Sequence, residues 1–119
     1  MDQMTDIRVL SASTLMKDKV YNYQSENIGR IEDFMLDLER GCISYAVLSF
    51  GGVMGMGDKL FAVPWKALAV DTENKAFRMD VDRERLENAP GFDKDNWPES
   101  ADTSWLGDVY DHYEVERYW

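Results

Sequence analysis

The alternation of apolar and polar side chains predicts a chain of short β-strands. The most apolar stretch is Cys42–Phe50, where apolar residues occupy both strand faces, as in a strand buried on two sides. A glycine-rich loop, residues 51–57, separates it from a second short strand, Lys59–Val63. Pro64 ends that strand because proline lacks a backbone donor. We expect these two strands to form the centre of the fold.

The segment Ile28–Leu38 fits two structures. Helical spacing matches part of it, yet Gly29 and the β-branched isoleucines favour a strand over a helix start. As a strand it would be out of phase at Ile31, and a bulge near residues 29–30 would restore the alternation. One face would then carry three large apolar side chains, Phe34, Leu36 and Leu38. A hairpin turn at residues 39–41 leads into the central strand.

Shorter elements complete the predicted fold. A short strand at Val9–Leu10 would precede one helical turn capped by Ser11 or Ser13. Two short helices are expected later, over Arg83–Asn88 with Asp82 as its cap, and from residues 103–104 to about residue 113. Three further strands are expected, at Lys19–Asn22, Leu68–Val70 and Ala76–Val81.

Length and charge narrow the possible functions. The chain has 119 residues, a single core and a net charge of -10, so a phosphate backbone or an anionic membrane would be repelled. Its start is polar and acidic, and no apolar run approaches the ~20 residues of a membrane span. We therefore expect a cytoplasmic protein without membrane insertion and without direct contact to nucleic acid.

The last part of the chain differs from the rest. Residues 89–119 contain eight acids and two bases, together with most of the tryptophans. Disordered tails seldom contain so many aromatic residues. We expect residues 1–88 to form one domain, and residues 89–119 to form an extension that packs on that domain or on a partner subunit.

Candidate chemistry is sparse. Residues 52–59 have the glycine spacing of a phosphate loop, but Asp58 stands where that loop needs lysine. Residues 93–104 begin like a calcium loop and lack its glycine and glutamate, so a solvated turn is expected. Cys42 is expected to be a buried small apolar side chain, and His112 a surface residue. We expect no catalytic residue, cofactor or metal site.

Four segments resemble a known family. They are residues 29–37, 41–52, 59–65 and 89–98, with the sequence KLFAVPW in the third as the clearest match. Together they are similar to the PRC-barrel domain, which occurs in the H subunit of the photosynthetic reaction centre and in a ribosome-maturation factor. The resemblance implies an all-β fold, a small bent antiparallel β-barrel of about six strands with a short helix and an aromatic C-terminal extension. It implies docking and no shared chemistry.

The predicted function is a non-enzymatic interaction module that self-associates as a homodimer or binds another protein. One alternative is an accessory subunit, resembling the H subunit, that docks on a membrane electron-transfer complex. Another is a small-molecule binder at the mouth of the barrel. The predicted contact residues, which an intramolecular core would explain equally well, are Phe50, Met54, Met56, Trp65, Trp97 and Trp105.

Overall fold

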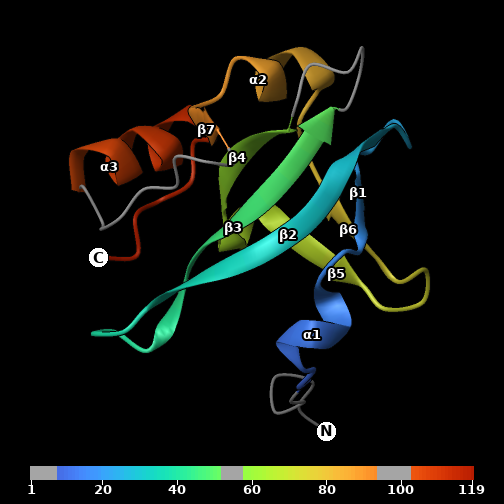
Figure 1. Cartoon of the computed structure of the whole chain (residues 1–119), viewed down its shortest axis with the longest axis horizontal. Helices are drawn as coiled ribbons and strands as arrows, with labels where there is room; N and C mark the ends of the chain where they lie inside the picture. The colour runs from blue at the N-terminus through green and yellow to red at the C-terminus, as the bar shows by residue number, and fades with distance from the viewer. Residues whose placement is uncertain (1–7, 52–57, 94–102) are drawn as a thin grey trace, which may run out of the picture.

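The computed structural model describes residues 8–51, 58–93 and 103–119, and it folds them around one curled sheet (Figure 1). The strands lie in the order β5-β6-β1-β2-β3-β4-β7. Their bounds are β1 Lys19–Tyr21, β2 Asn27–Asp37, β3 Cys42–Gly51, β4 Asp58–Pro64, β5 Leu68–Asp71, β6 Ala76–Met79 and β7 Gly91–Asp93. The helices are α1 Ala12–Leu15, the 3-10 turn η3 Trp65–Ala67, α2 Arg83–Glu87 and α3 Thr103–His112.

The sheet differs from the predicted antiparallel barrel of about six strands in three respects. It has seven strands, because β7 from the C-terminal extension pairs with β4. Strand β1 pairs with β6 in parallel, whereas the other ladders are antiparallel. The two outer strands of the order, β5 and β7, are not joined in the described residues, so the sheet is strongly bent without closing. Strand β6 forms its hairpin with β5 and has no direct connection to β1, so this pair is not limited to the antiparallel direction of a hairpin.

Strands β2 and β3 form the longest hairpin, which confirms a strand rather than a helix over residues 28–38. The register of β2 against β3 shifts between Ile31 and Asp33, which places one bulge at Glu32; against β1 it shifts at Ile28, next to the predicted position at residues 29–30. The shift at Glu32 brings Ile31 back to the buried side. Gly29 has another role. Its φ is +135°, and a Cβ there would lie 2.3 Å from the carbonyl oxygen of Ser49.

The core has two layers, one on each side of β3 and β4. Inside the bend, Ala46 and Leu48 pack with the large side chains of β2, β4 and β6. On the outer side, Tyr45 and Val47 pack with Leu106, Val109 and Tyr110 of the C-terminal extension. The prediction that the central strand is buried on both sides is therefore confirmed.

Several local predictions are confirmed and two are wrong. Ser11 caps α1, and Asp82 caps α2 through its side-chain bond to the Arg85 amide. Val9–Leu10, however, is not a strand. Cys42 is exposed rather than buried, because the first residues of β3 extend past the body of the sheet. The glycine-rich loop and most of the calcium-like segment lie outside the described residues.

Candidate interaction surface

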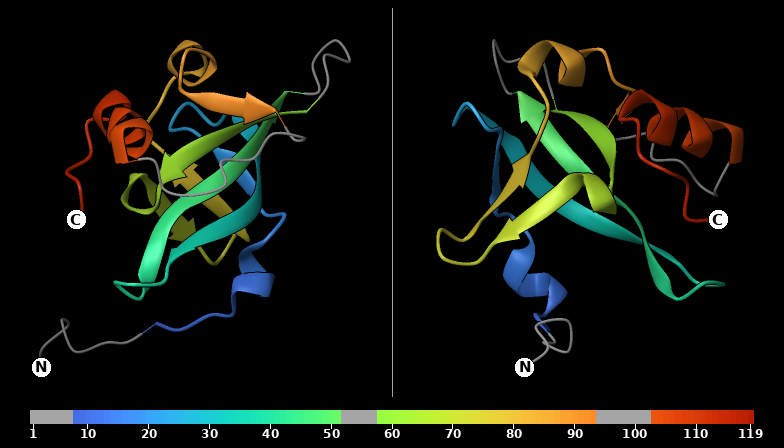
Figure 2. Two further views of the ribbon diagram at one scale, coloured as in Figure 1. Left: turned by 60° about the vertical axis from the view of Figure 1, so that its left-hand side comes forward. Right: turned by 180° about the vertical axis from the view of Figure 1, so that it is seen from behind.

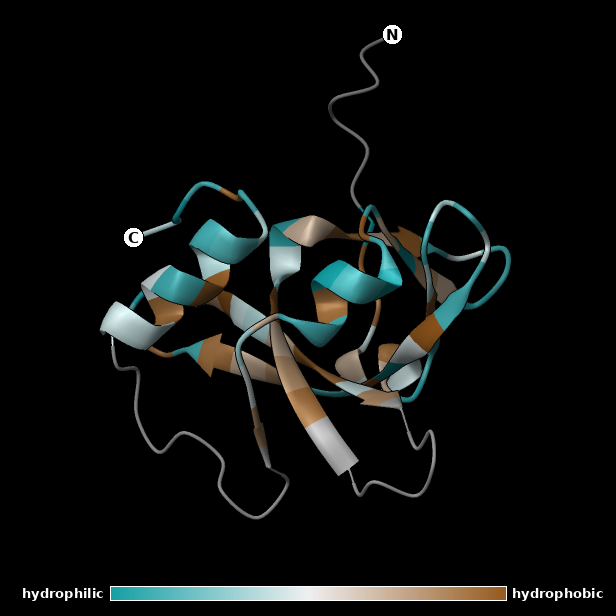
Figure 3. Ribbon diagram, turned by 90° about the horizontal axis from the view of Figure 1, so that it is seen from above, coloured by the Kyte–Doolittle hydropathy of each residue, from teal (hydrophilic) through white to brown (hydrophobic). Residues whose placement is uncertain are grey.

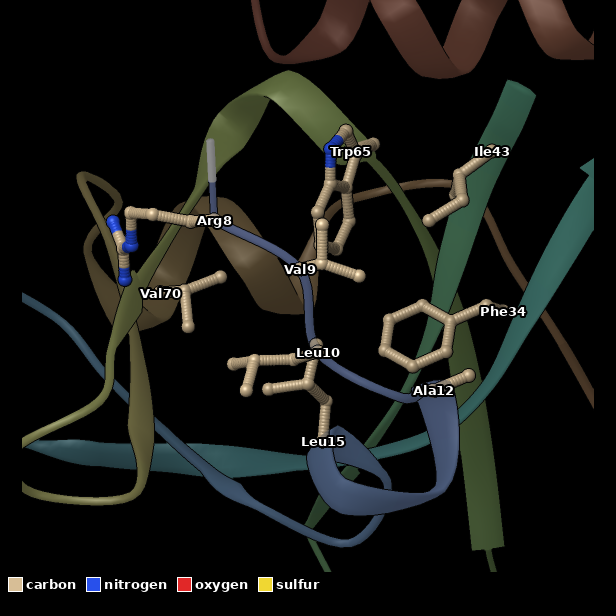
Figure 4. Close-up of a pocket in the computed structure, with 9 residues that line it drawn as sticks. All are labelled: Arg8, Val9, Leu10, Ala12, Leu15, Phe34, Ile43, Trp65 and Val70. Carbon is tan, nitrogen blue, oxygen red and sulfur yellow. The ribbon is translucent and has the colours of Figure 1, made fainter. Parts of the chain in front are cut away.

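One end of the bent sheet opens into an apolar cavity of about 420 Å³, which we call the mouth groove. Figure 4 shows Val9 and Leu10 crossing it, with Val70 on one side and Phe34 and Ile43 on the other. Among the described residues that line it, Arg8 is the only charged one. These lining residues are Arg8, Val9, Leu10, Ala12, Leu15, Phe34, Ile43, Trp65 and Val70.

Trp65 forms the wall of the groove nearest the core. It stands directly after Pro64, where β4 ends and the 3-10 turn begins. Its ring meets Phe34 edge-on at 5.7 Å and Phe77 at 6.2 Å between centroids. Such edge-to-face contacts fix a ring in one orientation. The indole is therefore rigid, and it remains half-buried and available at the groove.

A second cavity of about 300 Å³ adjoins the mouth groove and shares Leu10, Leu15 and Val70 with it. Its other lining residues are polar or charged: Thr14, Asp18, Asp71, Thr72 and Lys75. Burial raises the pKa of Asp18, and Lys75 partly opposes that rise. The groove thus passes from an apolar centre to a polar rim with charges of both signs.

The turn between β2 and β3 projects away from the rest of the sheet in Figures 1 and 2. We call residues 36–43 the hairpin end. Leu36 pairs with Ile43 across the strands, so both side chains lie on the face that contains the mouth groove. Leu36 is 63% exposed and Leu38 84% exposed. Of the predicted face of Phe34, Leu36 and Leu38, the first two lie on β2, where Phe34 is buried and Leu36 is exposed, whereas Leu38 lies in the turn.

The opposite face of the hairpin holds the C-terminal extension. Ser44 is a bulge residue with no partner in the β2 or β4 register, which leaves its carbonyl oxygen free to accept from the Tyr110 hydroxyl. The Tyr118 hydroxyl donates to Asp37 at 2.7 Å and lies 2.9 Å from the Ser44 hydroxyl. That hydrogen bond, followed by one from the Arg40 amide, lowers the pKa of Asp37. The extension is thus fixed on the barrel's own outer face.

A further contact joins α2 to the end of α3. The Arg85 guanidinium donates to the His112 carbonyl and to the Glu114 carboxylate, the latter at 2.7 Å. In return, Nε2 of His112 lies 2.8 Å from the Arg85 carbonyl oxygen. The single histidine is therefore half-buried and has a structural contact, rather than lying on the open surface as expected.

Acidic side chains gather over α2 and α3. Figure 3 shows the two helices next to each other, hydrophilic on their outer side. The exposed acids in this region are Asp80, Asp82, Glu84, Glu87, Asp108, Asp111, Glu114 and Glu116. The negative charge is thus concentrated on a different part of the surface from the mouth groove.

The predicted contact residues are divided among several places. Trp65 lies in the mouth groove. Phe50 packs on Phe61 and under Arg83, and Trp105 packs on Tyr45 and Phe92. Met54, Met56 and Trp97 lie outside the described residues. Sequence reasoning missed Val9, Leu10, Leu36 and Leu38 as contact residues, because it chose aromatic and methionine side chains by type.

Other kinds of site can be compared with the described residues. Within residues 8–51, 58–93 and 103–119, no three His, Cys, Asp or Glu side chains gather as a metal ion would require. None of the helices described there has the length and apolar content of a membrane span.

Comparison with known proteins identifies the fold. A search of curated proteins found no match to this chain. The family model for the PRC-barrel domain matches residues 8–86. This match runs from the first lining residue of the mouth groove to α2, and it leaves β7 and α3 outside. The resemblance of the sequence motifs is confirmed, and the chain belongs to the PRC-barrel domain family.

Proposed function

We propose that this protein is a non-enzymatic interaction module that self-associates through the apolar surface around its mouth. One observation supports this proposal above all. Among the described residues, five large apolar side chains are strongly exposed; Val9 and Leu10 line the mouth groove, and Leu36 is the cross-strand neighbour of its lining residue Ile43. Scattered exposed apolar residues are ordinary, but a group rimming one groove is typical of an interaction site.

The lining of the groove fits docking better than catalysis. The described lining residues offer carbon side chains, the Arg8 guanidinium and the Trp65 indole N–H, and none of them is a nucleophile or a general base. The aromatic contacts of Trp65 hold the groove in shape before anything binds. A preformed apolar surface binds without a large ordering cost. A second copy is the partner we propose, because isologous pairs are the commonest way to cover such a surface.

The test is the solution mass of the full chain over a range of concentrations, measured by light scattering. The monomer has a mass of 13.8 kDa, and we expect a concentration-dependent rise toward twice that value. A mass that stays at the monomer value at the highest soluble concentration would contradict self-association. Docking on a different, basic protein would then be the remaining form of the interaction hypothesis.

A small-molecule site is the second candidate, and the cavity volume favours it. About 420 Å³ lies in the range of ligand pockets. Such pockets also place a few convergent polar groups, and the described lining of the mouth groove offers only Arg8 and the Trp65 indole N–H. A thermal-shift screen of amphipathic anions tests this candidate, since a bound ligand raises the melting temperature. No shift with any of them would count against it.

A further inference from the structure

We propose that the two copies associate reciprocally, with the hairpin end of each copy lying in the mouth groove of the other. This inference rests on the proposed self-association and identifies the surface that makes it. The hairpin end is an apolar projection and the groove is an apolar hollow. One chain therefore carries both halves of a complementary contact.

The two halves lie on the same face of the molecule. Ile43 belongs to the lining of the groove, and its cross-strand neighbour Leu36 begins the exposed part of the hairpin. In an isologous pair, each copy uses the same surface to contact the other, so that surface must be complementary to itself. A projection and a hollow side by side satisfy this condition after a rotation by 180°.

The hairpin end does not fill its own groove. Leu38 is 84% exposed and Leu36 is 63% exposed, so neither side chain is covered by its own chain. Figure 1 shows the turn pointing outward from the sheet. A second copy supplies the apolar cover that the fold itself does not.

The charge distribution allows two acidic chains to meet on this face. Around the groove and its neighbouring cavity, two cations, Arg8 and Lys75, balance two carboxylates, Asp18 and Asp71. The hairpin end adds Asp37, Glu39 and Arg40, a net charge of -1, whereas the C-terminal extension has eight acids and two bases. Two copies with a net charge of -10 each can therefore approach through a surface that carries little of that charge.

The C-terminal extension holds the hairpin in position for this contact. Tyr118 and Tyr110 bind Asp37 and Ser44 from the opposite face of the hairpin. The turn itself is closed by the Asp37 carboxylate, which accepts from the amides of Glu39 and Arg40 at 3.0 Å each. A projection fixed in this way loses little freedom on binding, which favours the association.

The experiment compares the dimer dissociation constants of four full-length chains by sedimentation velocity: the unchanged protein, Leu38→Asp, Leu10→Lys and Tyr23→Asp. Tyr23 is the matched control, because it is 59% exposed and lies at the other end of β2. Each substitution occurs twice in a symmetric pair, so Leu38→Asp should weaken the dimer by roughly 100-fold or more. Tyr23→Asp should leave it unchanged. Circular dichroism of each variant checks that the fold is retained.

Mixing the two groove variants tests reciprocity directly. A pair of Leu38→Asp with Leu10→Lys has one unchanged contact and one in which Asp enters a groove that carries Lys. We expect the mixture to associate at least about 10-fold more tightly than either variant alone. Three results would overturn the reciprocal contact while leaving self-association intact. They are an equal weakening of the dimer by Tyr23→Asp, an unchanged dissociation constant for Leu38→Asp, and no gain in affinity when the two groove variants are mixed. A monomeric unchanged protein would instead remove the proposed function itself.

Discussion

Replacing Tyr110 by Phe tests whether the β-bulge at Ser44 anchors the C-terminal extension. Tyr110 is 2% exposed, and its hydroxyl donates to the Ser44 carbonyl oxygen, which has no ladder partner. Burial raises the pKa of the Tyr110 phenol above its ordinary 10.0, so the group remains a donor at neutral pH. The ring contacts to Tyr118 and Trp119 are kept in the variant. The change therefore isolates one hydrogen bond.

The expected loss follows from the carbonyl that is left behind. A buried acceptor without a partner costs about 1–3 kcal/mol. We expect Tyr110→Phe to lower the free energy of unfolding by about 1–2 kcal/mol, because the site is close enough to the surface for partial rehydration. For a domain of this size the melting temperature should fall by roughly 4 °C per kcal/mol. Urea unfolding followed by tryptophan fluorescence measures the loss, with an unchanged m value.

The matched control is Tyr23→Phe, which removes the same atom from an exposed ring. Its effect should stay within about 0.5 kcal/mol. If the two variants unfold at the same urea concentration, the Tyr110 hydroxyl does not stabilise the extension on the barrel, and our account of the bulge is refuted.

Three further predictions concern other parts of the molecule. The Tyr118 hydrogen bond lowers the pKa of Asp37 below 3.8 in the folded chain. This carboxylate therefore stabilises the fold above about pH 4, and its contribution is lost as the pH falls through the pKa of the folded state. Asp37→Asn should flatten the acid limb of a stability–pH curve. Gly29→Ala should lower the free energy of unfolding in urea by more than about 2 kcal/mol, because its Cβ would lie 2.3 Å from a backbone oxygen. Gly41→Ala, where φ is +66° and the space is open, should lower it by about 1 kcal/mol. Raising the salt concentration should tighten self-association in sedimentation experiments, since it screens the repulsion between two chains of charge -10, and weakening by salt would indicate an ion-paired contact instead.

The centre of the fold could be predicted because local sequence determines it. Apolar residues on both phases of β3 have only one stable place, between two packed layers. The shift at Glu32 could not be placed, because the alternation shows only that a shift is needed near Ile31. The register of β2 against β1 and β3 depends on how the strands pair, and so does the close approach of Gly29 to Ser49.

The parallel pairing of β1 with β6 could not be predicted from the sequence either, because it joins segments more than fifty residues apart. The same limit affected the contact residues. Choosing aromatic residues by type selected Phe50 and Trp105, which pack within the chain. The exposure of Leu36 and Leu38 depends on how far the hairpin extends past its neighbours, and residue type carries no information about that length.

Because side chains alternate along a strand, the two faces of the hairpin end contact different parts of the molecule. Leu36 and Ile43 face the mouth groove, while Asp37 and Cys42 form the next pair and face the C-terminal extension. The family match covers the barrel and ends before α3, so the partner of the second face is supplied by a segment outside the family fold. Covering that outer face within the chain leaves Leu36, on the groove face, 63% exposed. The extension binds the hairpin through Asp37 and Ser44. It therefore covers the outer face of the hairpin and also fixes the shape of the face at the groove.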